Sequence, residues 1–288
     1  MMTRNFDSKT VESFGQEWAR FDQTTLSDDE GARHFKQYFS NFPWHLLPPG
    51  GGVGADVGCG SGRWAKFVAP RAERLCLVDA SSEALEVAKR NLASFHNIEF
   101  YKADVGEIPF APASLDFAYS LGVLHHVPDT EAGIRTIAST LKPGAPLLLY
   151  LYYAFDNRPA WYRALWRASD AIRRVISRLP ARAKFAVAEV VAALIYWPLA
   201  RTGRFLDKLG CLPESWPLAF YRSCPFYLMR TDALDRFGTP LEKRFTRAQI
   251  EGMLLRAGLG QVRFSETPPF WCAVGIKAKA VEPVATLS

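Results

Sequence analysis

Short apolar runs alternate with segments of helical periodicity between residues 53 and 153. The runs at 53–57, 74–78 and 98–101 have the length of buried strands, and each is followed by a glycine or a charged residue. The segments between them repeat apolar residues every three or four positions, as helices with one buried face do. Strands that alternate with helices build βαβ units, so this stretch predicts a parallel sheet with helices on both faces.

Residues 1–50 carry two groups of apolar side chains at spacings of three and four, and Trp18 belongs to the first group. This spacing predicts a helical cap before the sheet. Proline and glycine residues end the pattern near residue 50. Such a cap either packs as a structural element or folds over a ligand as a lid.

The stretch 156–217 interrupts the alternation with two apolar helical segments. In the first, apolar side chains lie on one stripe and most arginines lie elsewhere, which predicts a basic amphipathic helix. The second, at 185–200, is almost wholly apolar, and its sixteen residues are too few to cross a bilayer comfortably. Three interpretations stay open: a structural cap packed on the sheet, a lid over an apolar or lipid-like acceptor that rests on an anionic membrane, and recognition of an anionic acceptor by the arginines.

Basic charge is concentrated in this same stretch. The chain has 288 residues and a formal net charge of +6. Residues 156–208 contain eleven Arg or Lys and four Asp or Glu, so they contribute +7 and the rest of the chain contributes −1. A protein that binds nucleic acid through its sheet domain would carry excess positive charge on that domain. Here the excess lies in residues 156–208 instead.

The five cysteines form no Cys-x-x-Cys pair and no metal-ligand spacing with the five histidines. We therefore expect buried thiols in a reducing compartment, and no metal site. The first residues lack the apolar segment of a signal peptide, which favours a cytoplasmic protein.

Three glycines at alternate positions, Gly58, Gly60 and Gly62, follow the first strand-like run. Glycine reaches positive φ without a steric penalty and lets a ligand approach the backbone closely. The amides at the start of the following helical segment are free donors at the positive end of the helix dipole. The turn thus predicts a floor for a small polar molecule, and an ordinary strand-to-helix connection is the alternative.

An acidic residue favours the ligand-binding interpretation. Asp79 ends the next strand-like run, seventeen residues after Gly62, where its carboxylate can accept hydrogen bonds from two ribose hydroxyls. The third glycine of a dinucleotide fingerprint would fall at Arg63, whose long side chain fits poorly there, and the Gly-Lys-Ser/Thr ending of a phosphate loop is absent. The residues favour a nucleoside and disfavour a phosphate cradle.

The segment 56–62, Asp-Val-Gly-Cys-Gly-Ser-Gly, resembles the first motif of the class I S-adenosylmethionine-dependent methyltransferases. Later segments resemble the same family in order. Asp79 matches its ribose-binding acid, 102–105 its adenine-binding stretch, and 115–129 its fourth strand and the loop that follows. The resemblance is close over residues 53–153 and weaker outside them.

The resemblance implies a site for S-adenosyl-L-methionine at the carboxyl edge of the sheet. It places the carboxylate of Asp104 on the adenine amine and the backbone amide of Val105 on the adenine ring. The segment around Trp18 is similar to one that folds over the cofactor in this family. The cofactor residues that we expect are Trp18, Asp56, Gly58, Cys59, Gly60, Gly62, Asp79, Ala80, Asp104, Val105, Ser120 and Leu121.

The resemblance also implies the fold. We expect a Rossmann-like α/β fold with a mostly parallel seven-stranded sheet in the order 3-2-1-4-5-7-6, helices on both faces and a helical insertion after the fifth strand. The segment 246–258 is similar to the last helix of the family, and two strand-like runs after it would form the antiparallel pair that closes the sheet. The expected parts are a cap or lid at 1–50, a core at 51–155 and 218–280, the insertion at 156–217 and a tail at 281–288.

Methyl transfer from a sulfonium is an in-line displacement with a good leaving group, so catalysis can come mainly from holding the reactants in line in a dry site. A general base is needed only for a protonated nucleophile such as a hydroxyl. His125 and His126, in the loop after the fourth strand, are the candidates for that base. Either histidine can instead cap or pack the loop.

The acceptor class is narrowed by absent motifs. Residues 120–123 read Ser-Leu-Gly-Val where DNA amino-methylating enzymes carry Asn/Asp-Pro-Pro-aromatic, and the chain has no Pro-Cys dipeptide of the cytosine C5 type. We expect a small-molecule or lipid-like acceptor, no nucleic acid, and peripheral membrane contact through 156–208. The alternatives are an NAD-dependent oxidoreductase, and an inactive cofactor-binding module that associates with a membrane or a partner.

Overall fold

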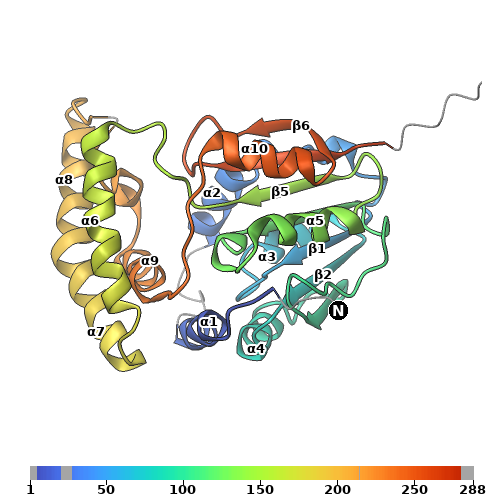
Figure 1. The fold of residues 1–288 in the computed structure, drawn as a ribbon, viewed down its shortest axis with the longest axis horizontal. Coiled ribbons are helices and arrows are strands. Elements are labelled where there is room, and N and C mark those ends of the chain that lie inside the picture. The colour runs from blue at the N-terminus through green and yellow to red at the C-terminus, as the bar shows by residue number, and fades with distance from the viewer. Residues whose placement is uncertain (1–4, 21–27, 214, 280–288) are drawn as a thin grey trace, which may run out of the picture.

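The computed structural model describes residues 5–20, 28–213 and 215–279. Seven strands form one sheet in the order β3-β2-β1-β4-β5-β7-β6 (Figure 1). Strands β1 to β5 run parallel, and β7 is antiparallel to both β5 and β6. This confirms the predicted fold class and strand order. The strands are β1 Val53–Val57, β2 Arg74–Asp79, β3 Ile98–Lys102, β4 Phe117–Leu121, β5 Pro146–Tyr150, β6 Leu259–Phe264 and β7 Cys272–Lys277.

Successive residues of a strand point to opposite faces of the sheet, and here both sets are apolar. Helices therefore cover both faces. In β5, Leu147 and Leu149 face one apolar cluster, and Leu148 faces the other. The first cluster includes residues of α5 and α10, and the second includes residues of α2, α3 and α4. The helices of this part are α1 Ser8–Arg20, α2 Asp28–Tyr38, α3 Ala65–Val68, α4 Ser82–Asn91, α5 Thr130–Thr140 and α10 Arg247–Arg256.

The insertion after β5 forms a separate helical layer. Its helices are α6 Ala160–Ile176, α7 Ala181–Val191, α8 Trp197–Lys208 and α9 Phe226–Gly238. In Figure 1, α6, α7 and α8 stand at the left, away from the sheet, and α9 lies between them and the rest of the molecule. Met229 and Ala233 of α9 belong to an apolar cluster with Ala188 of α7. The insertion therefore packs on α9 rather than on the sheet, and the helical layer extends to Gly238, beyond the boundary expected at residue 217.

The apolar segment expected at 185–200 belongs to a longer helix. A π turn, Ala192–Tyr196, joins α7 to α8, so one continuous helix runs over Ala181–Lys208. Its 28 residues exceed the expected sixteen because basic and polar residues at both ends continue the helix beyond the apolar run. By length and composition it is the one helix within the described ranges that could cross a membrane. Of its most apolar 18-residue stretch, 22% is buried.

Close packing between β1 and β4 gives a stability prediction. A Cβ added to Gly54 would lie 2.0 Å from the ring of Phe117, so we expect Gly54→Ala to lower the free energy of unfolding by about 1 to 3 kcal/mol. Gly260→Ala in β6 is the matched control, since its Cβ would meet nothing within 4 Å, and it should change stability by less than about 0.5 kcal/mol. Urea unfolding of both variants measures the difference. Equal losses would contradict the packing argument.

Candidate active site

A large cavity with a volume of about 1220 Å³ extends from the carboxyl ends of the parallel strands to the helical layer. At the sheet end its walls come from the glycine turn and from the residues that follow β2, β3 and β4. At the other end they come from α6, the π turn, α8 and α9, and residues before and within α1 close one side. Ligands of parallel sheets bind at this edge, where the strand order reverses between β1 and β4.

The glycine turn has the backbone geometry that its sequence predicts. Gly58, Gly60 and Gly62 all have positive φ, at 81°, 54° and 77°. A side chain at Gly58 would also meet Val123, with its Cβ 2.3 Å from the nearest methyl carbon. Only glycine combines this backbone with this close approach at no cost. The amide of Gly60 donates to Oδ2 of Asp79 at 3.0 Å, which fixes the turn against the end of β2.

Asp79 is held with its carboxylate at the cavity. Its Oδ1 accepts from the amide of Ser81 at 2.9 Å, and burial raises the pKa of this carboxyl above its usual value. A carboxylate has about four lone-pair positions, so two backbone bonds leave acceptor capacity for a ligand. Asp104 is arranged in the same way, since its Oδ1 accepts from the amides of Gly106 at 2.7 Å and Asn5 at 3.3 Å.

The structure brings most of the expected cofactor residues to this cavity. Those that line it are Gly58, Cys59, Gly60, Asp79, Ala80, Asp104, Val105 and Leu121. Asp56, Gly62 and Ser120 lie behind the wall. The hydroxyl of Ser120 donates to the carbonyl of Val57 at 2.8 Å and so joins β4 to β1. Burial raises the pKa of Asp56 to about 8. The side chain of Trp18 lies outside the described residues, although its backbone is part of α1.

A wall from the N-terminal segment was not among the expected site residues. The side chain of Asn5 donates to the carbonyl of Asp129 at 2.7 Å, and the amide of Asp129 donates back to it at 2.9 Å. Farther along, Phe14 of α1 contacts the ring of His126 edge-on, with centroids 4.9 Å apart. The segment thus forms one wall of the cavity, and its role as a lid stays a prediction. A single asparagine gives no sequence pattern, which is why Asn5 was missed.

The two candidate histidines occupy different environments. His126 lines the cavity, and its Nδ1 lies 2.6 Å from the carbonyl oxygen of Leu241. A carbonyl can only accept, so Nδ1 carries the proton, and Nε2 is a buried acceptor atom without a hydrogen-bond partner in the described part of the chain. Oδ1 of Asp235, on α9, lies 3.7 Å from that Nε2. The hydroxyl of Tyr152 donates to the other oxygen of Asp235 and holds this carboxylate in place.

His125 is fully buried and is not among the residues that line the cavity. Its Nδ1 accepts from the backbone amide of Tyr152 at 3.4 Å, and its ring stacks on the ring of Tyr152 with centroids 3.8 Å apart. Burial, with the nearby His126 and Arg244, holds the pKa of His125 well below its usual value. Its geometry is that of a packing residue, whereas the geometry of His126 suits a general base.

Comparison with known proteins bears on the family. The sequence profile of a family described as "Methyltransferase domain" matches residues 55–144. A ubiquinone biosynthesis O-methyltransferase of Xanthomonas axonopodis pv. citri (strain 306) is 34% identical over 173 residues, which are 59% of this chain and 70% of that protein. The chain belongs to the class I S-adenosylmethionine-dependent methyltransferases.

Two further similarities agree with this family. A demethylmenaquinone methyltransferase of Staphylococcus aureus (strain JH9) is 36% identical over 93 residues, or 31% of this chain and 38% of that protein. The structure of human N-acetylserotonin methyltransferase in complex with SAM shares the fold, with a TM-score of 0.52 and 17% identity over 93% of this chain and 57% of that one. Several other curated relatives are spanned over less than half of their length.

The protein is therefore an enzyme of the methyltransferase class, and its family uses a cofactor of the S-adenosylmethionine type. Membership in this family decides against the NAD-dependent oxidoreductase and the inactive module that the sequence left as alternatives. It does not name the acceptor.

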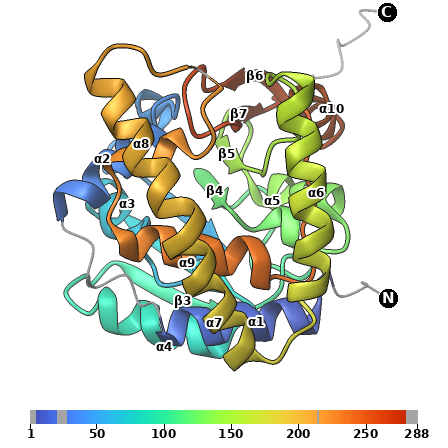
Figure 2. The same ribbon diagram turned by 90° about the vertical axis from the view of Figure 1, so that its left-hand side faces the viewer.

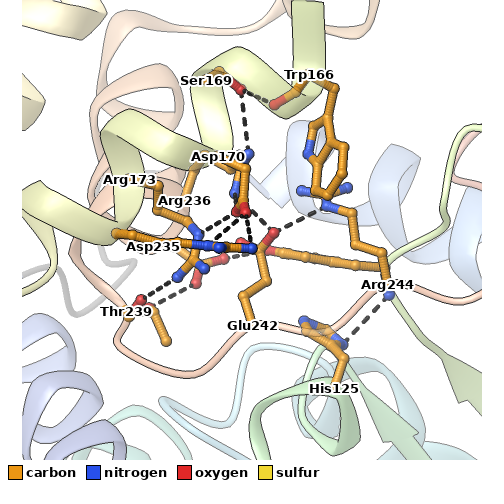
Figure 3. A network of polar contacts seen from close by, with 12 residues as sticks. His125, Trp166, Ser169, Asp170, Arg173, Asp235, Arg236, Thr239, Glu242 and Arg244 are labelled. Carbon is orange, nitrogen blue, oxygen red and sulfur yellow. Dashed lines mark hydrogen bonds and ion pairs between the residues drawn. The ribbon is translucent and has the colours of Figure 1, made fainter. Parts of the chain in front are cut away.

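A buried polar network fixes the helical layer of the methyltransferase to its core (Figure 3). Asp170 of α6 binds Arg173 at 2.7 Å and lies 3.7 Å from Arg236 of α9. Glu242, in the segment before α10, binds Arg236 at 2.7 Å and Arg244 at 2.9 Å. The side chain of Glu242 is 1% exposed. Breaking either ion pair would leave a buried charge without its partner and would lower the stability of the fold. The network joins α6 and α9 to the segment before α10.

The half of the cavity that the helical layer encloses contains a further carboxylate, which is partly buried. Asp232 of α9 lines the cavity and accepts a hydrogen bond from the hydroxyl of Tyr221 at 2.8 Å. Burial raises the pKa of Asp232 to about 6. A raised carboxyl pKa favours the protonated form in the folded state, so this contribution to stability is complete below about pH 4 and is lost as the pH rises through about 6.

We expect Asp232→Asn to remove this pH dependence, because Asn keeps an acceptor for Tyr221 without the charge. Relative to the unsubstituted enzyme, the variant should gain stability between pH 4 and pH 7, by about 3 kcal/mol at most. Urea unfolding across this range measures the gain. Glu251→Gln on α10 is the control, since that side chain is exposed and should leave the pH profile unchanged. Parallel profiles for Asp232→Asn and the unsubstituted enzyme would contradict the assignment.

Proposed function

We propose that the enzyme transfers the methyl group of S-adenosylmethionine to a hydroxyl of a small, aromatic or lipid-like acceptor. One observation carries this proposal: the cavity joins the glycine turn and Asp79 to a chamber lined by aromatic side chains, and His126 lies on its wall. The chamber includes Tyr152, Tyr153, Trp166, Tyr196, Phe220 and Tyr221. Such rings offer apolar surface with a polar edge, which suits an acceptor that is itself part apolar and part polar.

The relatives support the same acceptor class. One is named for O-methylation in ubiquinone biosynthesis and another for demethylmenaquinone, and both names point to quinone-type molecules.

The cysteines support a reducing, cytoplasmic location, because all five are free thiols and four of them are buried. We therefore propose a cytoplasmic enzyme.

The residues at the sheet end of the cavity suit the cofactor. We propose that Asp79 accepts hydrogen bonds from the ribose hydroxyls, and that Asp104 and the amide of Val105 hold the adenine. When bound, the cofactor supplies a sulfonium methyl group that can be displaced in line. The glycine turn would let the cofactor lie against the backbone, and the wall formed by Asn5 and Phe14 would exclude water from it.

His126 would act as the general base. Its Nε2 would take the proton of the acceptor hydroxyl as the oxygen attacks the methyl carbon, while Nδ1–H stays bonded to the carbonyl of Leu241. The carboxylate of Asp235 near Nε2 would stabilise the imidazolium that forms. The reaction would then balance: the acceptor hydroxyl would lose its proton to His126, an O–C bond would form, and the broken C–S bond would leave its electron pair on a neutral thioether sulfur.

Replacement of Asp79 tests the cofactor site. We expect Asp79→Ala to weaken binding of S-adenosylmethionine about 100-fold, because two hydrogen bonds to a charged acceptor are lost. Calorimetric titration with S-adenosylmethionine, S-adenosylhomocysteine and NADH measures the affinities. Glu86→Gln on α4, which is exposed, is the control and should bind normally. Binding of NADH, or unchanged affinity in Asp79→Ala, would contradict the site.

Replacement of His126 tests the base. We expect His126→Gln to lower kcat for a catechol acceptor by about 10²- to 10⁴-fold with unchanged cofactor affinity. The loss should shrink for acceptors of lower hydroxyl pKa, because these need less help from a base. His45→Gln is the control, since His45 is exposed and does not line the cavity. A loss that is equal for all acceptors would show that His126 has a positioning role.

A further inference from the structure

Large apolar side chains are exposed mainly on one face of the molecule. The described residues include thirteen such side chains, and eleven of them lie between Trp161 and Leu209. We call these eleven the apolar face; they are Trp161, Leu165, Ile172, Val175, Leu179, Val190, Leu194, Ile195, Trp197, Phe205 and Leu209. A concentration of this kind marks a surface that contacts another apolar body.

The apolar face belongs to two long helices at the outside of the enzyme. Figure 2 shows α6 and the continuous helix α7–α8 in front, with α9 crossing behind them. On α6 the usual order of an amphipathic helix is reversed: Leu165 and Ile172 are exposed, whereas Asp170 and Arg173 are buried in the polar network. Leu165 and Ile172 therefore do not pack this helix on the core, although Ile176 at its end is buried.

We infer that the apolar face docks onto the surface of an anionic lipid membrane. Charge complementarity supports this partner, because basic side chains surround the face. Those without an ion-pair partner among the described residues are Arg163, Arg167, Arg178, Arg182, Arg201, Arg204 and Lys208. The guanidinium of Arg201 lies 3.8 Å from the ring centre of Trp197, a pair suited to the zone between lipid headgroups and acyl chains. Each such cation near an anionic surface strengthens binding.

The long helix lies on the membrane and does not cross it. Ala188, Ala192 and Tyr196 pack on α9, and Glu189 binds Arg230 of α9 at 3.4 Å. A spanning helix would lose these contacts on one side and would carry Glu189 into the hydrocarbon layer. With one side packed on α9 and the other side apolar with basic residues along it, the helix has the pattern of an interfacial element.

The cavity opens on this same face. Leu165 and Ile172 of α6 and Ile195 of the π turn are each about half exposed, and all three also line the cavity. Its mouth therefore lies between the two helices that carry the apolar face. This part of the inference rests on the proposed lipid-like acceptor: an acceptor held in the membrane could enter the cavity between the helices without exposing its apolar part to water.

Flotation with lipid vesicles tests the docking. The full chain should bind vesicles that contain about one third phosphatidylglycerol, bind those of phosphatidylcholine alone at least tenfold more weakly, and lose affinity as salt rises from 50 to 500 mM. Leu194→Glu should weaken binding about tenfold or more. Leu255→Glu on α10 is the matched control, because both leucines are more than half exposed on helices and neither lines the cavity. Equal binding by the two variants would overturn the proposal.

Three further outcomes are decisive. Enzyme that stays with the vesicles after alkaline carbonate would be a spanning protein, which overturns an interfacial helix. If the chain does not bind vesicles and instead forms a stable dimer in sedimentation that depends on Leu194, the apolar face contacts a second copy of the chain. That result would also overturn membrane docking. Methylation of a water-soluble catechol should be equal in Leu194→Glu and the unsubstituted enzyme, whereas methylation of a long-chain catechol in vesicles should fall. If the unsubstituted enzyme methylates neither catechol, that result would instead contradict the proposed function.

Discussion

The bond between the amide of Gly60 and the carboxylate of Asp79 holds together the two strand ends on which the cavity is built. The glycine turn leaves β1 with three positive φ values, and it is anchored to β2 both by this bond and by the amide of Gly58, which donates to the carbonyl of Val78 at 2.7 Å. These bonds join the ligand floor to the end of β2 and to the acid beside it. The other walls of the cavity are placed against this floor.

The second constraint is the network around Asp170 and Glu242, which joins the helical layer to the segment before α10. A layer attached through exposed contacts alone would be free to shift, since surface ion pairs contribute little. Here the charges are buried and paired, so separating the layer would leave charge without solvent or partner. The aromatic chamber and the carboxylate of Asp235 near His126 therefore keep a defined position relative to the sheet.

These two constraints divide the enzyme by function. The sheet edge carries the residues to which we assign the cofactor, and the helical layer encloses the part of the cavity that we assign to the acceptor. The same layer presents the apolar face outward, so one insertion would serve both the acceptor and the membrane. Docking on an anionic surface would account for the net positive charge of residues 156–208, which is +7 against −1 for the rest of the chain.

Local patterns in the sequence determined the alternation of strands and helices, the glycine turn and the acid at the end of β2, because each is set by residues close together in the chain. The strand order and the other expected cofactor residues followed from the resemblance of these segments to the methyltransferase family. The sheet has that order, and eight of the expected residues line the cavity. Tertiary structure decided what depends on distant partners. The burial of Arg173 rather than Leu165, the place of α9 in the helical layer, and the meeting of His126 with Asp235 all depend on which surfaces come together. Helical periodicity defines a stripe on a helix, but it cannot say whether that stripe faces the core or the outside.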